Sequence, residues 1–390
     1  MKKIRLIVSI CALLFVVGCK REPMIHISEE RQESIDAKQG NKKKKVEEKN
    51  KKEKTDKEKY LSMIDRQSLK NIDDSIYLDI SDYLPQQANQ LKHFTNGLDD
   101  FYTYIDFFNP GELMQVRYMT GNQMNIKVYY IDSTHITEMM NRENIKTPFK
   151  DFRNEAVQTP DSPLITSLQA PLKVGHQWVY DGKHSSEITA IYETFPLTAG
   201  EFKNVIEVKT SFDQYDLYQY FAQNDGIVAF YQEPKSEDQP KLFWELKENH
   251  KDVKMVQELS IWEPKVSDEG KDIEPINERI EFKTNDTLAL VLDSIFKKNQ
   301  WIEKDASVFQ VYSDGQVATL ELMQVNDTTF KDGIIKAMLQ TVCDFLDVDQ
   351  AKLFVNGTYF TNDTEFNEQG LYQSIHKSQE GNQGQSEGSE

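Results

Sequence analysis

The chain has 390 residues and a formal net charge of −18 at pH 7, and it contains three cysteines. This length is enough for two or three domains, each with its own hydrophobic core. The acidic balance argues against nucleic acid as a partner, because binding to phosphates requires clustered lysine and arginine. The composition fits a solvated protein outside the membrane.

The N-terminus has the pattern of a secretory leader. Lys2, Lys3 and Arg5 precede an apolar run over residues 6–17. A basic start followed by a short apolar run is typical of a signal peptide. The run is also shorter than the ~20 residues that a membrane-spanning helix needs.

The residues that end this run, Val16-Val17-Gly18-Cys19, resemble the lipobox of bacterial lipoproteins. In such proteins the cysteine thiol, a good nucleophile, receives the lipid and becomes the new N-terminus. The resemblance implies that residues 1–18 are a signal peptide and that Cys19 is lipidated with acyl chains such as palmitate. The protein would then be extracytoplasmic and anchored to the cell membrane. The alternative is a plain signal peptide with a chance cysteine.

Residues 19–60 are predicted to form a disordered tether behind the lipid. Between residues 20 and 59 there are fourteen basic residues, ten acidic residues and no aromatic one. Such a segment buries too little apolar surface to offset the entropy of the chain. We expect a spacer that carries the folded part away from the membrane. Alternatively, its lysines bind anionic lipid or wall polymer.

The region 75–263 is predicted to be an antiparallel, β-rich domain. Apolar and polar residues alternate over 114–118 and 124–130, and the turn between them indicates a β-hairpin. Further short runs continue as far as Trp262, several of them separated by Asp-Gly or Asn-Gly turns. The one helix expected in this region covers residues 137–141.

Eight aromatic side chains of this region are candidates for the lining of a sugar-binding or hydrophobic groove. They are Tyr118, Tyr129, Tyr130, Trp178, Tyr180, Tyr218, Tyr220 and Tyr231. Packing within the sheet is the simpler interpretation, because aromatic residues are generally favoured in strands.

Parts of this region resemble a segment that precedes a germination-type domain in bacterial surface lipoproteins. The matching stretches lie at 171–178, 199–208, 220–222 and 226–228. The resemblance covers roughly residues 90–260, and it implies no known chemistry.

The pattern changes after residues 264–275, a polar stretch with two prolines and a glycine that indicates a linker. Residues 276–360 are predicted to form a compact β-α-β-β-α-β sandwich, so that the fold class is α+β. The expected elements are a strand at 279–283, a helix at 287–298, a hairpin at 308–322, a helix at 330–346 and a strand at 353–355. Both helices have apolar residues at helical spacing, and Asn285 or Asp286 is expected to cap the first.

This order of elements resembles the sporulation and spore germination domain of the GerMN type. The stretches that carry the resemblance lie at 287–290, 311–318, 340–341 and 348–357. The sequence departs from the family at 319–322, where aspartate and small polar residues are common. The resemblance implies a non-enzymatic module that acts in envelope assembly or germination, and it also implies self-association.

Residues 363–390 are rich in Gln, Glu, Gly and Ser and are predicted to be a disordered tail. Cys343 lies within the apolar pattern of the second predicted helix. With Cys11 in the leader and Cys19 lipidated, Cys343 has no partner for a disulfide. We interpret it as a buried structural thiol.

The sequence contains no recognisable catalytic, metal or cofactor motif, so no such residue is predicted. Its seven histidines lack the spacing of a metal-binding helix, although His176 and His184 flank one predicted turn. The aspartate pairs and runs at 73–74, 99–100 and 344–349 are interpreted as solvated surface. General acid–base chemistry would require two carboxylates in one cleft.

Together these patterns predict a non-catalytic, membrane-anchored lipoprotein that binds or scaffolds envelope components, with a role in sporulation or germination. The expected partners are the membrane, reached through the lipid, and envelope proteins or wall polymer. The alternative function is a module that binds cell-wall glycan, peptide or a small ligand on its aromatic β face.

Overall fold

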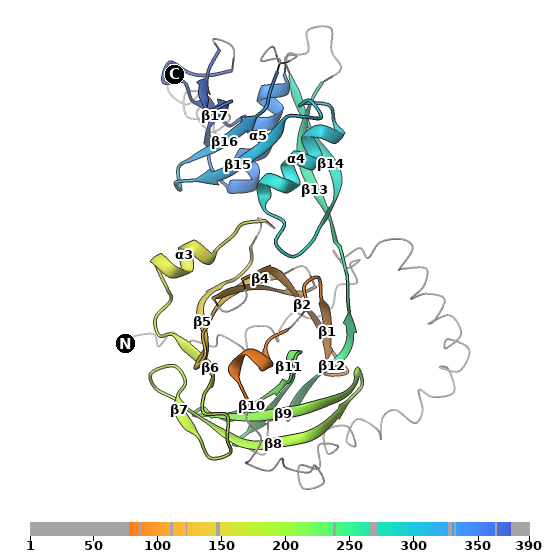
Figure 1. The fold of residues 1–390 in the computed structure, drawn as a ribbon, viewed down its shortest axis with the longest axis vertical. Helices are drawn as coiled ribbons and strands as arrows, with labels where there is room; N and C mark the ends of the chain where they lie inside the picture. The colour runs from red at the N-terminus through yellow and green to blue at the C-terminus, as the bar shows by residue number, and fades with distance from the viewer. Residues whose placement is uncertain are drawn as a thin grey trace, which may run out of the picture.

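A computed structural model describes residues 78–375, except 86, 110–111, 122, 146–148, 237–238, 266–271, 327–329, 331–332 and 363–364. The predicted signal peptide, the tether and the last part of the predicted tail lie outside the described residues. The described chain forms a large β-barrel and a smaller α+β unit beside it (Figure 1).

Twelve antiparallel strands form the barrel sheet, in the spatial order β6-β5-β4-β3-β2-β1-β12-β11-β10-β9-β8-β7. The strands are β1 (Leu91–Thr95), β2 (Asp100–Phe108), β3 (Leu113–Thr120), β4 (Gln123–Ile131), β5 (His135–Arg142), β6 (Ile165–Gln169), β7 (Gln177–Val179), β8 (Ser185–Leu197), β9 (Gly200–Ser211), β10 (Tyr215–Ala222), β11 (Gly226–Pro234) and β12 (Leu242–His250). The predicted antiparallel, β-rich domain is therefore present, and its hairpin at 114–130 is β3–β4.

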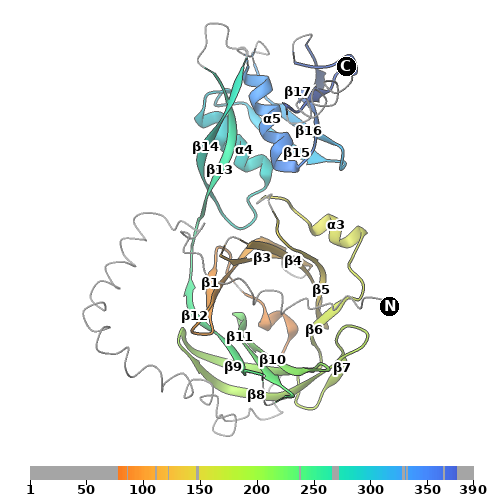
Figure 2. The ribbon, with the colours of Figure 1, turned by 180° about the vertical axis from the view of Figure 1, so that it is seen from behind.

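The sheet curves into a ring that is almost closed (Figures 1 and 2). The first strand pairs with the last, with Leu91 opposite His250. At the opposite side β6 and β7 meet without a regular ladder. There the Thr166 backbone N–H donates to the Tyr180 carbonyl over 2.9 Å, and the Trp178 indole donates to the Thr166 carbonyl over 2.8 Å. The described strands therefore enclose an interior, and the ring is interrupted between β6 and β7.

Both faces of the β3–β4 hairpin are buried, for different reasons. Ile126 and Val128 pack outside the barrel, in a cluster with Ala156 of α3 (Arg153–Gln158). Lys127 and Tyr129, which alternate with them, line the interior. The helix expected at 137–141 is wrong, because these residues lie in β5, which pairs with β4 and β6.

A short segment before β1 fills part of the barrel interior. It contains the 3₁₀ helix η2 (Ile80–Tyr83), which Asp79 caps by accepting from the Ser81 N–H. Ile80 and Tyr83 are almost fully buried, and the Tyr83 hydroxyl donates to the Asn204 carbonyl of β9 over 2.8 Å. In Figure 1 this segment lies within the ring of strands.

The smaller unit contains two helices and two separate sheets. Its elements are β13 (Met255–Pro264), β14 (Ile273–Phe282), α4 (Leu288–Lys298), β15 (Ser307–Ser313), β16 (Val317–Met323), α5 (Ile334–Leu346), β17 (Gln350–Val355), β18 (Thr358–Phe360) and β19 (Tyr372–Gln373). The predicted order is present as β14-α4-β15-β16-α5-β17. Its arrangement differs from the predicted sandwich, because β14 pairs with β13 in a two-stranded ribbon outside the β15–β18 sheet.

The predicted boundary between the two units is wrong. The sequence pattern places residues 255–262 in the middle domain and 264–275 in a linker, but β13 and β14 form one long hairpin. β13 packs on α5, where the Trp262 indole donates to the Asp344 carboxylate over 2.7 Å and its backbone N–H donates to the Thr341 hydroxyl over 3.0 Å. This tertiary contact assigns β13 to the smaller unit.

Two local predictions in the smaller unit also need correction. Thr287, rather than Asn285 or Asp286, caps α4 by accepting from the Leu290 N–H. The tail predicted to be disordered from residue 363 is ordered over 365–375. Tyr372 pairs with Ala351 of β17, is only 2% exposed and donates its hydroxyl to the Gln340 side chain over 2.7 Å.

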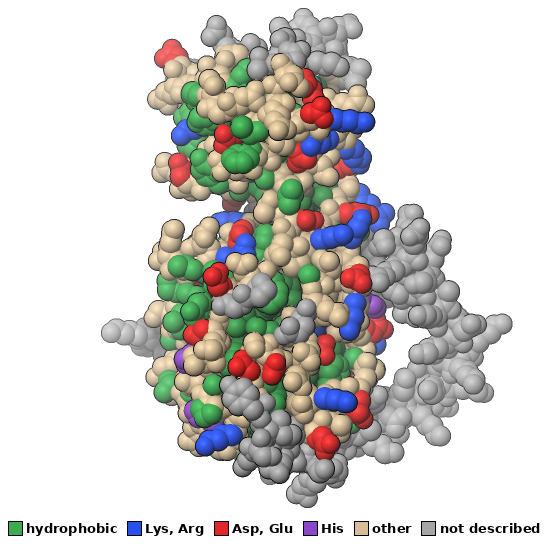
Figure 3. Space-filling model, in the orientation of Figure 1, with side chains coloured by type: hydrophobic (Ala, Val, Ile, Leu, Met, Phe, Trp, Pro, Cys, Tyr) green, Lys and Arg blue, Asp and Glu red, His purple; other side chains and the backbone are tan. Residues whose placement is uncertain are grey.

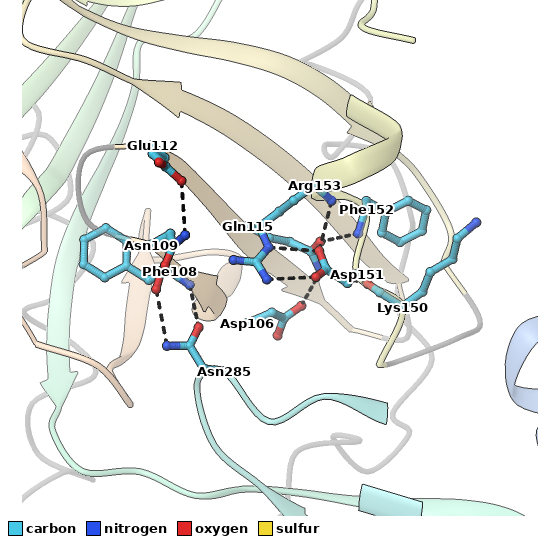
Figure 4. Close-up of polar contacts among 10 residues, drawn as sticks. All are labelled: Asp106, Phe108, Asn109, Glu112, Gln115, Lys150, Asp151, Phe152, Arg153 and Asn285. Atoms are coloured by element: carbon cyan, nitrogen blue, oxygen red, sulfur yellow. Dashed lines mark hydrogen bonds and ion pairs between the residues drawn. The ribbon is translucent and has the colours of Figure 1, made fainter. Parts of the chain in front are cut away.

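The hydrophobic core of the smaller unit extends onto the barrel, where it includes Leu91, Tyr104, Met119 and Phe149. Phe149, in the segment after β5, lies edge-on to Phe282 of β14 and Phe345 of α5. Polar contacts accompany this core: the Asn285 side chain accepts from the Phe108 N–H and donates to the Phe108 carbonyl (Figure 4). These contacts fix the smaller unit against the outside of the barrel.

Candidate ligand-binding cavity

The barrel interior contains a cavity of about 300 Å³. Its walls come from strands on all sides of the ring, including β2 to β6 and β10 to β12. A second cavity of about 80 Å³ lies next to it and is lined by Tyr83, Leu84 and Pro85 of the segment around η2. The two cavities share Tyr118, Tyr129 and other wall residues, so the segment 78–85 closes one side of a common interior.

Aromatic rings form most of the apolar wall of the larger cavity. They are Phe101, Tyr118, Tyr129, Tyr180, Phe230 and Trp244. Phe101 contacts Trp244 at 5.1 Å and Phe230 at 6.3 Å between ring centroids, so part of this wall is a continuous aromatic surface. In Figure 3 hydrophobic side chains gather in the middle of the barrel, with acidic and basic side chains interspersed around them.

An ion pair and two phenols lie in the cavity wall. The Lys127 ammonium is 2.8 Å from the Glu138 carboxylate, and their side chains are 16% and 8% exposed. Burial by itself would lower the pKa of Lys127, but the neighbouring Glu138 carboxylate raises it above its ordinary value. Burial raises the pKa values of Tyr118 and Tyr129, whose hydroxyls are 3.0 Å apart. Lys127 therefore keeps its charge beside Glu138, and the phenols keep their protons.

Amide side chains complete the lining. They are Gln123, Asn125, Asn141, Asn144, Gln219 and Gln232. Gln219 of β10 is only 5% exposed, and its side-chain oxygen accepts no hydrogen bond from any described residue. A buried acceptor without a donor costs free energy, so this oxygen is a candidate contact for a ligand.

Three of the eight aromatic residues suggested by the sequence line the cavity, namely Tyr118, Tyr129 and Tyr180. The other buried rings belong to the packed cores: Trp178 lies in the cluster around η2, and Tyr218, Tyr220 and Tyr231 lie in a cluster under β8–β12. Tyr130 is 42% exposed on the outside of β4. Of these eight rings, three therefore line a cavity, four pack in the cores and one is exposed.

Sequence reasoning did not find the other lining residues. Lys127 lies between Ile126 and Val128, so the alternation of apolar and polar residues indicates that the Lys127 face of the strand is exposed to solvent. That alternation was correct, but the side it marks faces the barrel interior. Gln219 and Trp244 gave no signal, because only the curvature of the sheet brings β10 and β12 opposite β4.

The remaining sequence candidates do not converge in the described part of the chain. No group of three or more His, Cys, Asp or Glu there has the geometry of a metal site. His184 pairs with Asp181 at 2.8 Å, whereas His176 stacks on Trp178. Asp100 pairs with His93, with the carboxylate 3.0 Å from the imidazole.

The two cysteines assigned a role have different outcomes. Cys19, the predicted lipidation site, lies outside the described residues. Cys343 is 1% exposed on α5, and burial raises its pKa to about 12, so the prediction of a buried structural thiol is confirmed. Among the residues that the structure covers, none of the helices has both the length and the apolar character needed to span a membrane.

No protein-family model and no curated protein matches the chain. Two solved structures are similar to part of it. One, from Bacteroides fragilis, is named as an exported protein with a YmcC-like fold; it has 14% identity and a TM-score of 0.29, and the match covers 43% of this chain and 98% of that one. The other, from Parabacteroides distasonis, is named as a lipoprotein; it has 13% identity and a TM-score of 0.27, with 44% and 100% coverage. Likeness at this level supports no inference about this chain.

Proposed function

We propose that this protein is a lipid-anchored, extracytoplasmic binding protein that holds a component of the cell envelope in its barrel cavity. The leader and Cys19 support the location, and the cavity carries the function. Its concave, mainly aromatic wall with a few polar groups is the general form of a small-ligand site. The ligand-binding interpretation, which was the alternative from the sequence, thus becomes the preferred one.

Binding without catalysis is the simplest use of this cavity. General acid–base catalysis needs a group that can exchange a proton near neutral pH. Glu138 is held by Lys127 in an ion pair, and the buried phenols keep their protons. The other groups in the wall are amides, hydroxyls, aromatic rings and the carboxylate of Glu143, and together they suit the binding and orientation of a ligand.

A scaffold role for the smaller unit is the second candidate. Four large apolar side chains are exposed among the described residues of this unit: Leu290 on α4 by 57%, Phe309 and Tyr312 on β15 by 61% and 52%, and Tyr359 on β18 by 40%. Exposed apolar side chains mark sites of protein association where they form one contiguous patch. They suit the contact with envelope proteins, or the self-association, that the resemblance to the GerMN-type domain implies. A role in sporulation or germination stays a prediction.

The binding function can be tested by ¹⁹F NMR on the full-length chain in lipid nanodiscs, with its tryptophans replaced by 5-fluorotryptophan. The chain has four tryptophans, and of these only Trp244 lines the cavity in the described structure. A solubilised cell-wall digest should shift the Trp244 resonance and leave those of Trp262 and Trp301 unchanged. The control is the same digest buffer after the dissolved wall fragments have been removed. An unchanged Trp244 resonance with all wall and membrane fractions would contradict the proposal.

A further inference from the structure

The polar part of the cavity consists mainly of groups without charge. Six amide side chains line it together with Thr120 and Ser167. An amide both donates and accepts hydrogen bonds, as does a hydroxyl. A ligand that matches this lining carries several hydroxyl or amide groups of its own.

The charges in the wall disfavour an ionic ligand. Lys127 and Glu138 neutralise each other, and the remaining carboxylate, Glu143, would repel an anion. An organic cation would compete with the Lys127 ammonium for the Tyr118 ring, because that ammonium already lies 5.6 Å from the ring centroid. The favoured ligand is therefore neutral.

The barrel offers few free backbone groups for a peptide. One common way in which an extended peptide binds is by adding a strand to an open sheet edge. Here β3, β4, β10 and β11 each pair with strands on both sides. Recognition in this cavity must therefore use side chains. A ligand whose hydroxyl groups point outward from its ring in several directions fits a wall with amides on opposite strands.

From these features we infer that the cavity binds a neutral saccharide, with its sugar faces on the aromatic wall and its hydroxyls on the amides. The inference rests on the proposed binding function. The Gln219 side-chain oxygen, buried and unpaired among the described residues, would accept from a sugar hydroxyl or acetamido N–H. The rings of Phe101, Phe230 and Trp244 would cover the apolar face of the same sugar.

Defined probes separate this inference from the proposed function. The 5-fluorotryptophan-labelled chain in nanodiscs would be titrated separately with N,N′-diacetylchitobiose, cellobiose, maltotriose, N-acetyl-trialanine amide and decanol. We expect at least one saccharide to shift the Trp244 resonance in a saturable way, and the peptide and the alcohol to leave it unchanged. A shift with peptide or decanol and none with the saccharides would overturn the ligand class while retaining the cavity function. No shift with any probe or wall fraction would overturn both.

A substitution at Gln219 tests the contact directly. Gln219→Leu keeps the volume and removes the amide, so the fold should be retained while saccharide affinity falls about ten-fold, the effect of one neutral hydrogen bond. Gln177→Leu makes the same change on the exposed β7 strand, where the amide pairs with Glu187, and should leave affinity unchanged. Equal affinity for the Gln219→Leu and Gln177→Leu variants would contradict the assigned contact.

Discussion

Removal of the Asp106 carboxylate should destabilise the protein strongly. The Arg117 guanidinium donates to both Asp106 oxygens over 3.0 and 3.2 Å, and the two side chains are 2% and 4% exposed. The Gln115 amide donates to the same carboxylate over 3.3 Å and to the Lys150 carbonyl over 3.0 Å (Figure 4). Arg117 also lies 5.1 Å over the ring of Phe282 of β14. The pair thus stands where the barrel meets the smaller unit.

The expected loss follows from what remains after Asp106→Ala. A buried arginine without its counter-charge costs about 3–5 kcal/mol, a large part of the ~5–15 kcal/mol that stabilises a typical domain. Urea unfolding followed by circular dichroism would measure this as a lower midpoint at an unchanged slope. Since a buried pair can be replaced by apolar side chains with little cost, the double variant Asp106→Leu with Arg117→Met should recover most of the loss.

An exposed ion pair provides the control. Lys254 and Glu281 are 3.0 Å apart, and each is about half exposed, so Glu281→Ala should cost less than about 1 kcal/mol. The reasoning is refuted if Asp106→Ala costs no more than Glu281→Ala. It is equally refuted if the double variant is as unstable as the single one.

Three further predictions concern buried groups. Burial lowers the pKa of Lys92 to about 8, below its value of ~10.4 in an unfolded chain. Between these two pH values the unfolded state binds more protons than the folded state, so the free energy of unfolding should rise by up to about 1.4 kcal/mol per pH unit. The Lys92→Met variant should lack this rise. In a chain carrying Cys11→Ser and Cys19→Ser, Cys343 should react with a thiol reagent at pH 8 only as fast as the protein unfolds. Tyr372→Phe, which leaves the buried Gln340 oxygen without this donor, should cost about 1–2 kcal/mol in urea unfolding.

Each of these has a clear contrary result. The Lys92 prediction would be contradicted if the free energy of unfolding changed with pH between pH 8 and 10 by the same amount in the original chain and in the Lys92→Met variant. Rapid modification of Cys343 under conditions where circular dichroism shows a folded chain would contradict its burial. A Tyr372→Phe variant as stable as the original would show that the segment 365–375 is held by other contacts.

Local sequence patterns predicted the strands and helices well, because each depends on neighbouring residues. The turn between 118 and 124 defines the β3–β4 hairpin, and the apolar spacing of residues 334–345 defines α5. The β-rich nature of the middle region and the order of elements after it followed from such signals.

The long-range features were not predictable in this way. The sequence pattern of β13 resembles one more strand of the meander. Its pairing with β14 and its contacts with α5, such as the hydrogen bond between Trp262 and Asp344, 82 positions apart, assign it to the smaller unit. The cavity depends on the pairing of β1 with β12 and on the curvature between them. Alternation assigned Lys127 to one face of a strand but did not indicate that this face is the inside of a barrel.

The central claim, that the barrel cavity holds a neutral saccharide from the cell envelope, is tested most directly by native mass spectrometry. The full-length lipoprotein would be released gently from its own membrane and compared with the Gln219→Leu variant. The account predicts a non-covalent adduct with the mass of a neutral saccharide on the original chain and a much smaller fraction of it on the variant. The original chain without any adduct, or the same adduct at equal occupancy on both, would contradict the account.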